Sequence, residues 1–245
     1  MKQFFLCAVV AAVAAISAPA QAVTVSFGFT NSNAPGGDGS GKTSPFLSPA
    51  NVATSNVLVE TFDRPNGGCG VNTPANLVSI TGGSFGTRAG TISGAAAPAG
   101  DTTCFAYGPA IGGTLPDKVT LDYAGLINNV TGPLNYLGLY YGSIDNYNDL
   151  EFYGTNGTIT TVTGQSLIDL FNGTSGDRTS NASNVYVNLF FAPDELFKGF
   201  SFITTGIAFE MDNVAVGNVP EPASLALVAA GLAALGLKRR RKLAP

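Results

Sequence analysis

The chain has 245 residues, with 12 basic side chains, 16 acidic side chains and no histidine. The lack of histidine excludes Ser-His-Asp and Cys-His catalysis and most kinds of zinc site. Only 11% of the residues are charged, whereas 31 are glycine and 14 are proline, which favours short strands joined by turns over helices.

The first 22 residues have the three parts of a secretory signal peptide. A positively charged start at residues 1–2 precedes an apolar stretch at 4–16, and Ala-Gln-Ala at 20–22 is a small-x-small cleavage site. We therefore predict a short signal helix that directs the chain to the Sec translocon. Signal peptidase would then leave Val23 as the first mature residue.

Residues 23–218 form the predicted mature domain, and this domain is strongly acidic. It contains six basic residues against fifteen carboxylates, which gives a net charge of −9. Such a surface repels nucleic acid, so we expect no nucleic-acid partner. Cys69 and Cys104 are its two cysteines, and we expect a disulfide between them in the oxidising compartment outside the inner membrane.

Short strand-like runs recur between turn clusters in this domain. In one of them Val185, Val187 and Leu189 fall on one face and Tyr186 on the other. The pattern predicts an antiparallel β-sandwich, and within that class a jelly roll. The runs are residues 23–30, 56–62, 118–123, 136–141, 149–153, 158–162, 185–191, 199–204 and 207–216.

The last of these runs changes phase. Met211 and the two alternate residues before it share one face, whereas Val214 and Val216 have the opposite parity. We therefore predict a β-bulge that turns the side chains of Asp212 and Asn213.

The remaining segments predict little regular structure. Residues 31–50 are expected to form a long flexible loop, and residues 64–116 a turn-rich region in which the disulfide substitutes for regular structure. One helix is predicted at 166–171, with Ser166 as its N-cap. Residues 36–43 match the phosphate-loop pattern G-x-x-x-x-G-K-[ST], but the prolines after them block the helix that phosphate binding requires, so we reject nucleotide binding.

One set of acidic residues predicts a structural Ca²⁺ ion. Calcium takes six to eight oxygen ligands. Jelly-roll binding modules often hold such an ion with acidic groups of their first and last strands. Glu60 and Asp63 of an early strand and Asp212 of the last one are the predicted ligands at matching places. A less specific alternative is the turn at 145–149, and the simple alternative is that these carboxylates face solvent.

Carbohydrate binding needs aromatic faces that stack on sugar rings. Tyr136, Tyr140 and Tyr147 are the predicted stacking residues, with Asp145 as a hydrogen-bonding partner. Tyrosines in strands also serve as core residues, so the structural alternative stays open. The carboxylates between 145 and 151 leave a glycoside hydrolase as a third possibility, but we expect solvated turn and edge groups there and no enzymatic activity.

Residues 219–245 contain three parts in a fixed order. Two prolines keep the first part extended, namely Val219, Pro220, Glu221 and Pro222. The apolar stretch 223–237 predicts a transmembrane helix of about 22 Å at about 1.5 Å per residue, short for a hydrocarbon core of about 30 Å and suited to a temporary hold. The third part stops translocation with Lys238, Arg239, Arg240, Arg241 and Lys242.

This order closely resembles the PEP-CTERM sorting signal of Gram-negative bacteria. The resemblance implies that an exosortase recognises residues 219–222 and removes the segment beyond them; an ordinary C-terminal anchor is the alternative. Residues 136–148 and 208–216 are similar to blocks of exosortase-dependent surface proteins, which implies a location and a fold more than a chemistry.

We therefore expect a non-enzymatic secreted surface or extracellular-matrix protein. It would be held transiently at the inner membrane, then released or attached to extracellular polysaccharide. The alternative is a carbohydrate-binding module that acts on that polysaccharide.

Overall fold

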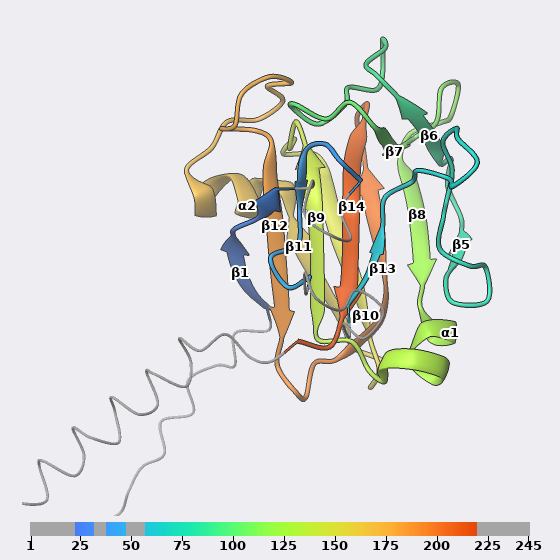
Figure 1. The fold of residues 1–245 in the computed structure, drawn as a ribbon. Coiled ribbons are helices and arrows are strands. Elements are labelled where there is room, and N and C mark those ends of the chain that lie inside the picture. The colour runs from blue at the N-terminus through green and yellow to red at the C-terminus, as the bar shows by residue number, and fades with distance from the viewer. Residues whose placement is uncertain (1–22, 32–37, 48–56, 220–245) are drawn as a thin grey trace, which may run out of the picture.

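The structure is a computed structural model that describes residues 23–31, 38–47 and 57–219, and it contains two antiparallel sheets packed face to face (Figure 1). The predicted β-sandwich is therefore confirmed. The predicted signal helix and the predicted membrane helix at 223–237 lie outside the described residues. Within the described ranges, no helix is both long enough and apolar enough to span a bilayer.

The first sheet has the strand order β1-β12-β9-β14-β7-β6, and β4 also pairs with β14. One edge of β14 is shared, because Met211 pairs with Ala106 of β7 and Val214 pairs with Glu60 of β4. β14 is thus an interior strand with three neighbours. The strands of this sheet are β1 (Val23–Phe27), β4 (Val57–Glu60), β6 (Gly86–Ala89), β7 (Cys104–Gly108), β9 (Tyr136–Gly142), β12 (Val185–Phe191) and β14 (Phe209–Gly217).

The second sheet has the order β11-β10-β13-β8-β5, and a two-stranded ribbon joins β2 to β3. From β7 to β10, and again from β11 to β14, successive strands alternate between the two large sheets, the kind of crossing that a jelly roll uses. The strands are β2 (Thr30–Asn31), β3 (Lys42–Thr43), β5 (Ser79–Thr81), β8 (Asp117–Asp122), β10 (Asn148–Gly154), β11 (Ile159–Thr163) and β13 (Phe197–Thr204).

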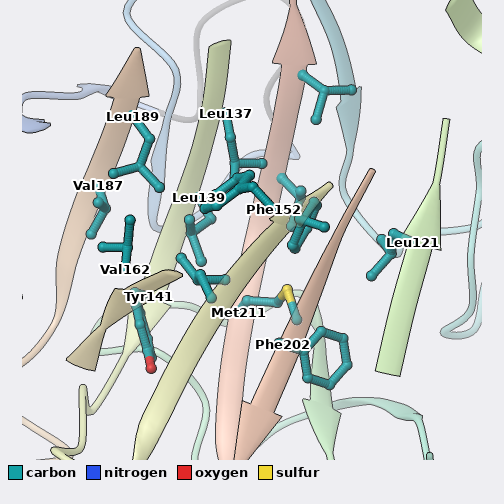
Figure 2. Packing of buried hydrophobic residues seen from close by; sticks show 14 of the residues in the cluster. Leu121, Leu137, Leu139, Tyr141, Phe152, Val162, Val187, Leu189, Phe202 and Met211 are labelled. Atoms are coloured by element: carbon teal, nitrogen blue, oxygen red, sulfur yellow. The ribbon is translucent and has the colours of Figure 1, made fainter. Parts of the chain in front are cut away.

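The main core fills the space between the two sheets (Figure 2). Leu137 and Leu139 of β9 meet Phe152 of β10 there, and all three side chains are buried. The Phe152 ring centroid lies 4.7 Å from that of Phe191 and 5.4 Å from that of Phe197. Because burial of one such side chain contributes about 1.5–3 kcal/mol, this aromatic and aliphatic layer is the main source of stability.

The outer face of the first sheet is also covered. Tyr136 and Tyr140 point away from the main core, yet both are fully buried. Residues 38–47 lie over them: the Ser44 and Tyr136 hydroxyls are 2.8 Å apart, and a Cβ placed on Gly41 would lie 3.0 Å from the Tyr140 ring. The expected long flexible loop is therefore partly an ordered cover that includes β3.

The predicted bulge in the last strand is confirmed. Opposite β9, Asp212 pairs with Tyr140 and Ala215 with Gly138, so two residues of β14 face Leu139 alone. Asn213 has a positive φ of 47°, and its backbone carbonyl accepts a 3.0 Å hydrogen bond from the Tyr186 hydroxyl. The inserted residue keeps the apolar residues on both sides of it in the main core, and it leaves Asp212 on the outer face.

Two local predictions need correction. The region 64–116 contains the strands β5, β6 and β7, although the predicted Cys69–Cys104 disulfide is confirmed there. Helix α2 (Gly164–Phe171) begins before Ser166, because Thr163 is its N-cap and accepts a 3.1 Å hydrogen bond from the Ser166 backbone amide. The short α1 (Ala124–Leu126) and the π-helical turn η1 (Ile127–Thr131) were not predicted.

Candidate functional site

Asp212 occupies an unusual position for a carboxylate. It lies at the bulge of β14, directly opposite Tyr140 and therefore on the same outer face of the sheet, and it is fully buried beneath the covering segments. Burial raises the pKa of Asp212 well above its ordinary value, and the neighbouring charges of Asp101 and Asp38 raise that pKa further. Charge is costly at this position unless an opposite charge compensates it.

Three carboxylates converge at this position. Asp38, Asp101 and Asp212 each present one oxygen such that all three oxygens lie within 4.8 Å of one another. Asp38 precedes β3 in the covering segment, and Asp101 precedes β7. We refer to these three residues as the acidic cluster.

Two similar turns present the first two members of the acidic cluster. The Ser40 amide donates to Asp38 Oδ1 at 3.0 Å, and the Thr103 amide donates to Asp101 Oδ1 at 2.9 Å. The Ser40 hydroxyl also donates to Asp101 Oδ1 at 2.7 Å, while the Thr103 hydroxyl lies 2.8 Å from Asp38 Oδ2. The two turns therefore bind each other and orient both carboxylates toward β14.

Asn213 adds an amide group to the acidic cluster. Its Nδ2 donates to Asp38 Oδ2 at 3.1 Å and to Asp212 Oδ2 at 2.8 Å. Its side-chain carbonyl oxygen is buried without a hydrogen-bond partner, and the same holds for Asp101 Oδ2 and Asp212 Oδ1. Buried oxygens are normally hydrogen-bonded, so the unpartnered acceptors on these three residues call for a further partner, such as a water molecule or a cation.

The predicted calcium ligands are only partly brought together. Asp63 lies close to the acidic cluster: burial raises its pKa, and the charges of Asp38 and Asp101 raise that pKa further. Its Oδ1 accepts from the Cys104 amide at 3.2 Å, and its Oδ2 has no hydrogen-bond partner. Glu60 has another role, because its carboxylate accepts the backbone amides of Phe62, Asn72 and Thr73 at 2.7–3.0 Å. Glu60 is thus a loop-organising residue.

Sequence reasoning missed Asp38 and Asp101 because both lie in turns. In a turn, the alternation of residues along a strand cannot be used to predict where a side chain points. The available signal was the shared pattern Asp-x-Ser/Thr, which is typical of turns closed by an Asp side chain. Asp38 belongs to the segment that mimics a phosphate loop. Its Lys42 and Thr43 form β3 where a phosphate loop would begin a helix.

The predicted sugar-contact residues do not form a platform. Tyr136 and Tyr140 are fully buried, and the Tyr140 hydroxyl binds the Ala99 carbonyl. Tyr147 is half-buried and donates to the Ile207 carbonyl at 3.2 Å, while Asp145 is buried and accepts from the Ser175 hydroxyl at 3.2 Å. The stacking role assigned to Tyr136 and Tyr140 is therefore corrected to a packing role, because neither ring has a face open to a ligand.

A shallow pocket of about 350 Å³ lies elsewhere on the surface, beside β1. Phe29 borders it and is 55% exposed, and Lys42 Nζ lies 5.1 Å from the centroid of that ring. The other lining residues are Phe27, Asn181, Val185 and Tyr186.

The last described residue, Val219, is bound to the sandwich. Its amide donates to Asn135 Oδ1 at 2.8 Å, and its carbonyl accepts from Asn135 Nδ2 at 2.8 Å, so one side chain mimics a paired strand. The Val219 side chain is 4% exposed and packs in a cluster with Leu47, Val57 and Tyr136. The chain is therefore still bound to the sandwich at Val219, the residue before the segment that begins at Pro220.

Comparison with known proteins identifies that segment. Residues 218–242 match the family model described as the PEP-CTERM protein-sorting motif. No curated protein matches the chain. Among solved structures, the CBM22-1–GH10 modules of the Clostridium thermocellum endo-1,4-beta-D-xylanase 10B, complexed with xylohexaose, align at 8% identity and a TM-score of 0.34.

That alignment covers 66% of this chain and 28% of the xylanase chain, and at this similarity it carries no argument about ligand or activity. The sorting motif is the informative match, because it begins at the point where β14 ends. It implies exosortase-dependent sorting and an exported, surface or extracellular location. The chain carries a PEP-CTERM protein-sorting motif at residues 218–242, as the order of its C-terminal segments predicts.

Proposed function

We propose that the chain is a non-enzymatic secreted protein of the cell surface or extracellular matrix, delivered there by signal-peptide export and exosortase processing. The observation that carries the proposal is the sorting motif at 218–242, which continues from the sandwich without a linker. In this scheme the apolar stretch 223–237 holds the protein transiently at the inner membrane. Processing then releases the sandwich or attaches it to extracellular polysaccharide.

The carboxylates that could serve a hydrolase support the non-enzymatic assignment. Glu151 forms an ion pair with Lys118 at 2.5 Å, and Asp149 accepts the Gly164 amide at 3.1 Å. Asp145 is engaged by Ser175. A glycosidase needs two carboxyl groups about 5–10 Å apart across an open cleft, and these three groups are instead occupied by structural contacts.

Mass spectrometry of the protein from the producing cells tests this proposal. We expect a mature chain that begins at Val23 and has lost the residues that follow positions 219–222. In cells that lack the exosortase, the C-terminal segment should stay attached. Recovery of an intact 223–242 segment on the surface protein of exosortase-containing cells would refute the sorting step.

Carbohydrate binding is a second candidate function, and the exposed Phe29 beside its pocket is the observation that favours it. An exposed ring next to a lysine and an asparagine offers stacking and hydrogen bonding to a sugar. We expect glycan-array binding to be lost in Phe29→Ala and kept in Ile159→Ala, which removes another exposed apolar side chain (63% exposed, against 55% for Phe29) on β11. No binding by the parent protein would reject this candidate.

A further inference from the structure

The acidic cluster joins three segments that are far apart in the sequence. Asp38 comes from the cover over the outer face, Asp101 from the segment before β7, and Asp212 from the bulge of β14. The bulge brings Asp212 to the other two carboxylates, because it leaves Asp212 on the outer face of the sheet while the apolar residues of β14 stay in the main core. An arrangement built by a bulge and two hydrogen-bonded turns is a preformed site.

The negative charge of the cluster has no protein partner. The described residues contain one ion pair, Lys118–Glu151, and it involves none of these carboxylates. Asp63 adds a fourth acidic group nearby and also has an unpartnered buried oxygen. Carboxylates this close together repel one another, and a bound cation would offset that repulsion.

Asn213 provides independent support from outside the acidic cluster. It is fully buried, and its side chain is aimed into the cluster, where Nδ2 contacts both Asp38 and Asp212. Its side-chain carbonyl oxygen nevertheless lacks a partner. A rotation of the amide about its last bond would exchange the nitrogen for the oxygen and direct a fourth oxygen, a neutral one, at the same point.

The donor set selects the class of cation. Every group is a carboxylate or amide oxygen, which suits hard cations, whereas thiolate and imidazole ligands are absent from these described residues. Ca²⁺ accepts six to eight oxygens in flexible geometry, while Mg²⁺ requires a nearly ideal octahedron. Asp groups from three separate segments match the flexible geometry better.

We propose that Asp38, Asp101 and Asp212, together with the side-chain carbonyl oxygen of Asn213, bind a calcium ion that fastens the outer cover to the last strand. Asp63 lies next to this site and increases its negative charge. The bound ion offsets two of the three carboxylate charges and provides a partner for oxygens that otherwise have none. Calcium would therefore favour the folded state, and the cover over Tyr136 and Tyr140 would depend on it.

The test measures calcium binding and unfolding of the full chain, purified in mild detergent and freed of metal with EDTA. Titration calorimetry with CaCl₂ should give one site with a Kd of about 10⁻⁴ M or tighter. At a free Ca²⁺ concentration of 100 Kd, the unfolding equilibrium constant should fall about 100-fold. MgCl₂, and NaCl at matched ionic strength, should have a much smaller effect.

Asp212→Asn is the decisive variant, with Asp101→Asn as the second one if the first does not fold. In EDTA each variant should be as stable as the parent or more stable, because the substitution removes one carboxylate that lies close to the other carboxylates of the acidic cluster. In Ca²⁺ the order should reverse, with Kd weakened at least about 10-fold. Asp117→Asn is the matched control: Asp117 is also buried with one unpartnered oxygen, but it lies on β8, and its variant should keep the parent response to Ca²⁺.

Three results would overturn the proposal. The first is no calorimetric binding up to several-fold above about 10⁻³ M, the weak end for extracellular calcium modules. The second is equal stabilisation by Ca²⁺ and Mg²⁺, which would indicate charge screening. The third is an unchanged calcium response in both Asp212→Asn and Asp101→Asn.

Discussion

The contact between Asn135 and Val219 leads to a prediction about sorting. An exosortase that binds residues 219–222 as an extended strand must reach the Val219 backbone, whose amide and carbonyl are both hydrogen-bonded to the Asn135 side chain at 2.8 Å. Val219 must therefore undock before it can be gripped. Asn135→Ala removes both bonds, while the backbone bonds of residue 135 to Gly217 and Phe191 can remain.

The size of the effect can be worked out from those two bonds. Each neutral hydrogen bond contributes about 1 kcal/mol net, so undocking should become easier by about 2 kcal/mol. This corresponds to about a 30-fold larger undocked population. Because an enzyme that selects the undocked form gains in proportion to that population, processing at limiting exosortase should accelerate by up to about the same factor.

Two measurements on the full chain check this prediction. Hydrogen exchange at the Val219 amide should become about 30-fold faster in Asn135→Ala, and pulse-chase labelling should show faster loss of the C-terminal segment. Asn218→Ala is the matched control, because Asn218 Nδ2 forms one exposed bond, at 3.1 Å, to the Pro133 carbonyl. If exchange accelerates as expected while processing does not, the exosortase does not need a released Val219, and the reasoning fails.

Three further predictions concern stability, each measured by denaturant unfolding. Phe152→Ala should lower the free energy of unfolding by about 3–5 kcal/mol, because its buried ring packs against three other phenylalanines; a loss below about 1 kcal/mol would contradict the described core. Cys69→Ser with Cys104→Ser should cost about 4 kcal/mol from the 35-residue separation, and an unchanged midpoint would contradict it. The ion pair with Lys118 lowers the pKa of Glu151 in the folded protein. The pair therefore stabilises the fold at pH values above the ordinary glutamate pKa, and this stabilisation is lost as the pH falls through the lowered pKa of the folded state. Glu151→Gln should accordingly be less stable than the parent near neutral pH by under about 1 kcal/mol, since solvent screens the pair, and the difference should vanish in acid; a difference that grows in acid would contradict the sign.

Sequence reasoning succeeded where a local pattern determines the structure. The change of parity between Met211 and Val214 located the bulge, because only an inserted residue keeps both side chains in one core. The predicted mature domain has two cysteines, so one disulfide between them was the simple prediction, and the structure contains that disulfide. The order of the C-terminal segments was sufficient to identify the sorting motif.

Sequence reasoning failed where distant segments meet. The residues of β7 (104–108) are buried on both faces of the sheet, so apolar and polar residues do not alternate along this strand. The sequence therefore lacked the pattern from which a strand is predicted. Tyr140 could be assigned to a strand from the sequence, but the segment that covers and buries it could not be predicted. In the same way Asp212 was a predicted ligand, whereas Asp38 and Asp101 reach it only through tertiary contacts.

The interior position of β14 has a consequence for vectorial export. A chain that crosses the membrane from its N-terminus delivers β14 after every other described strand, and this strand then has to insert between β9 on one side and β7 and β4 on the other. Until it does, the middle of the first sheet stays open, with the edges of three strands unpaired. In the proposed export scheme, the sorting motif after β14 would therefore reach the exosortase at about the time when the sheet can close, and chain order would couple completion of the fold to presentation of the signal.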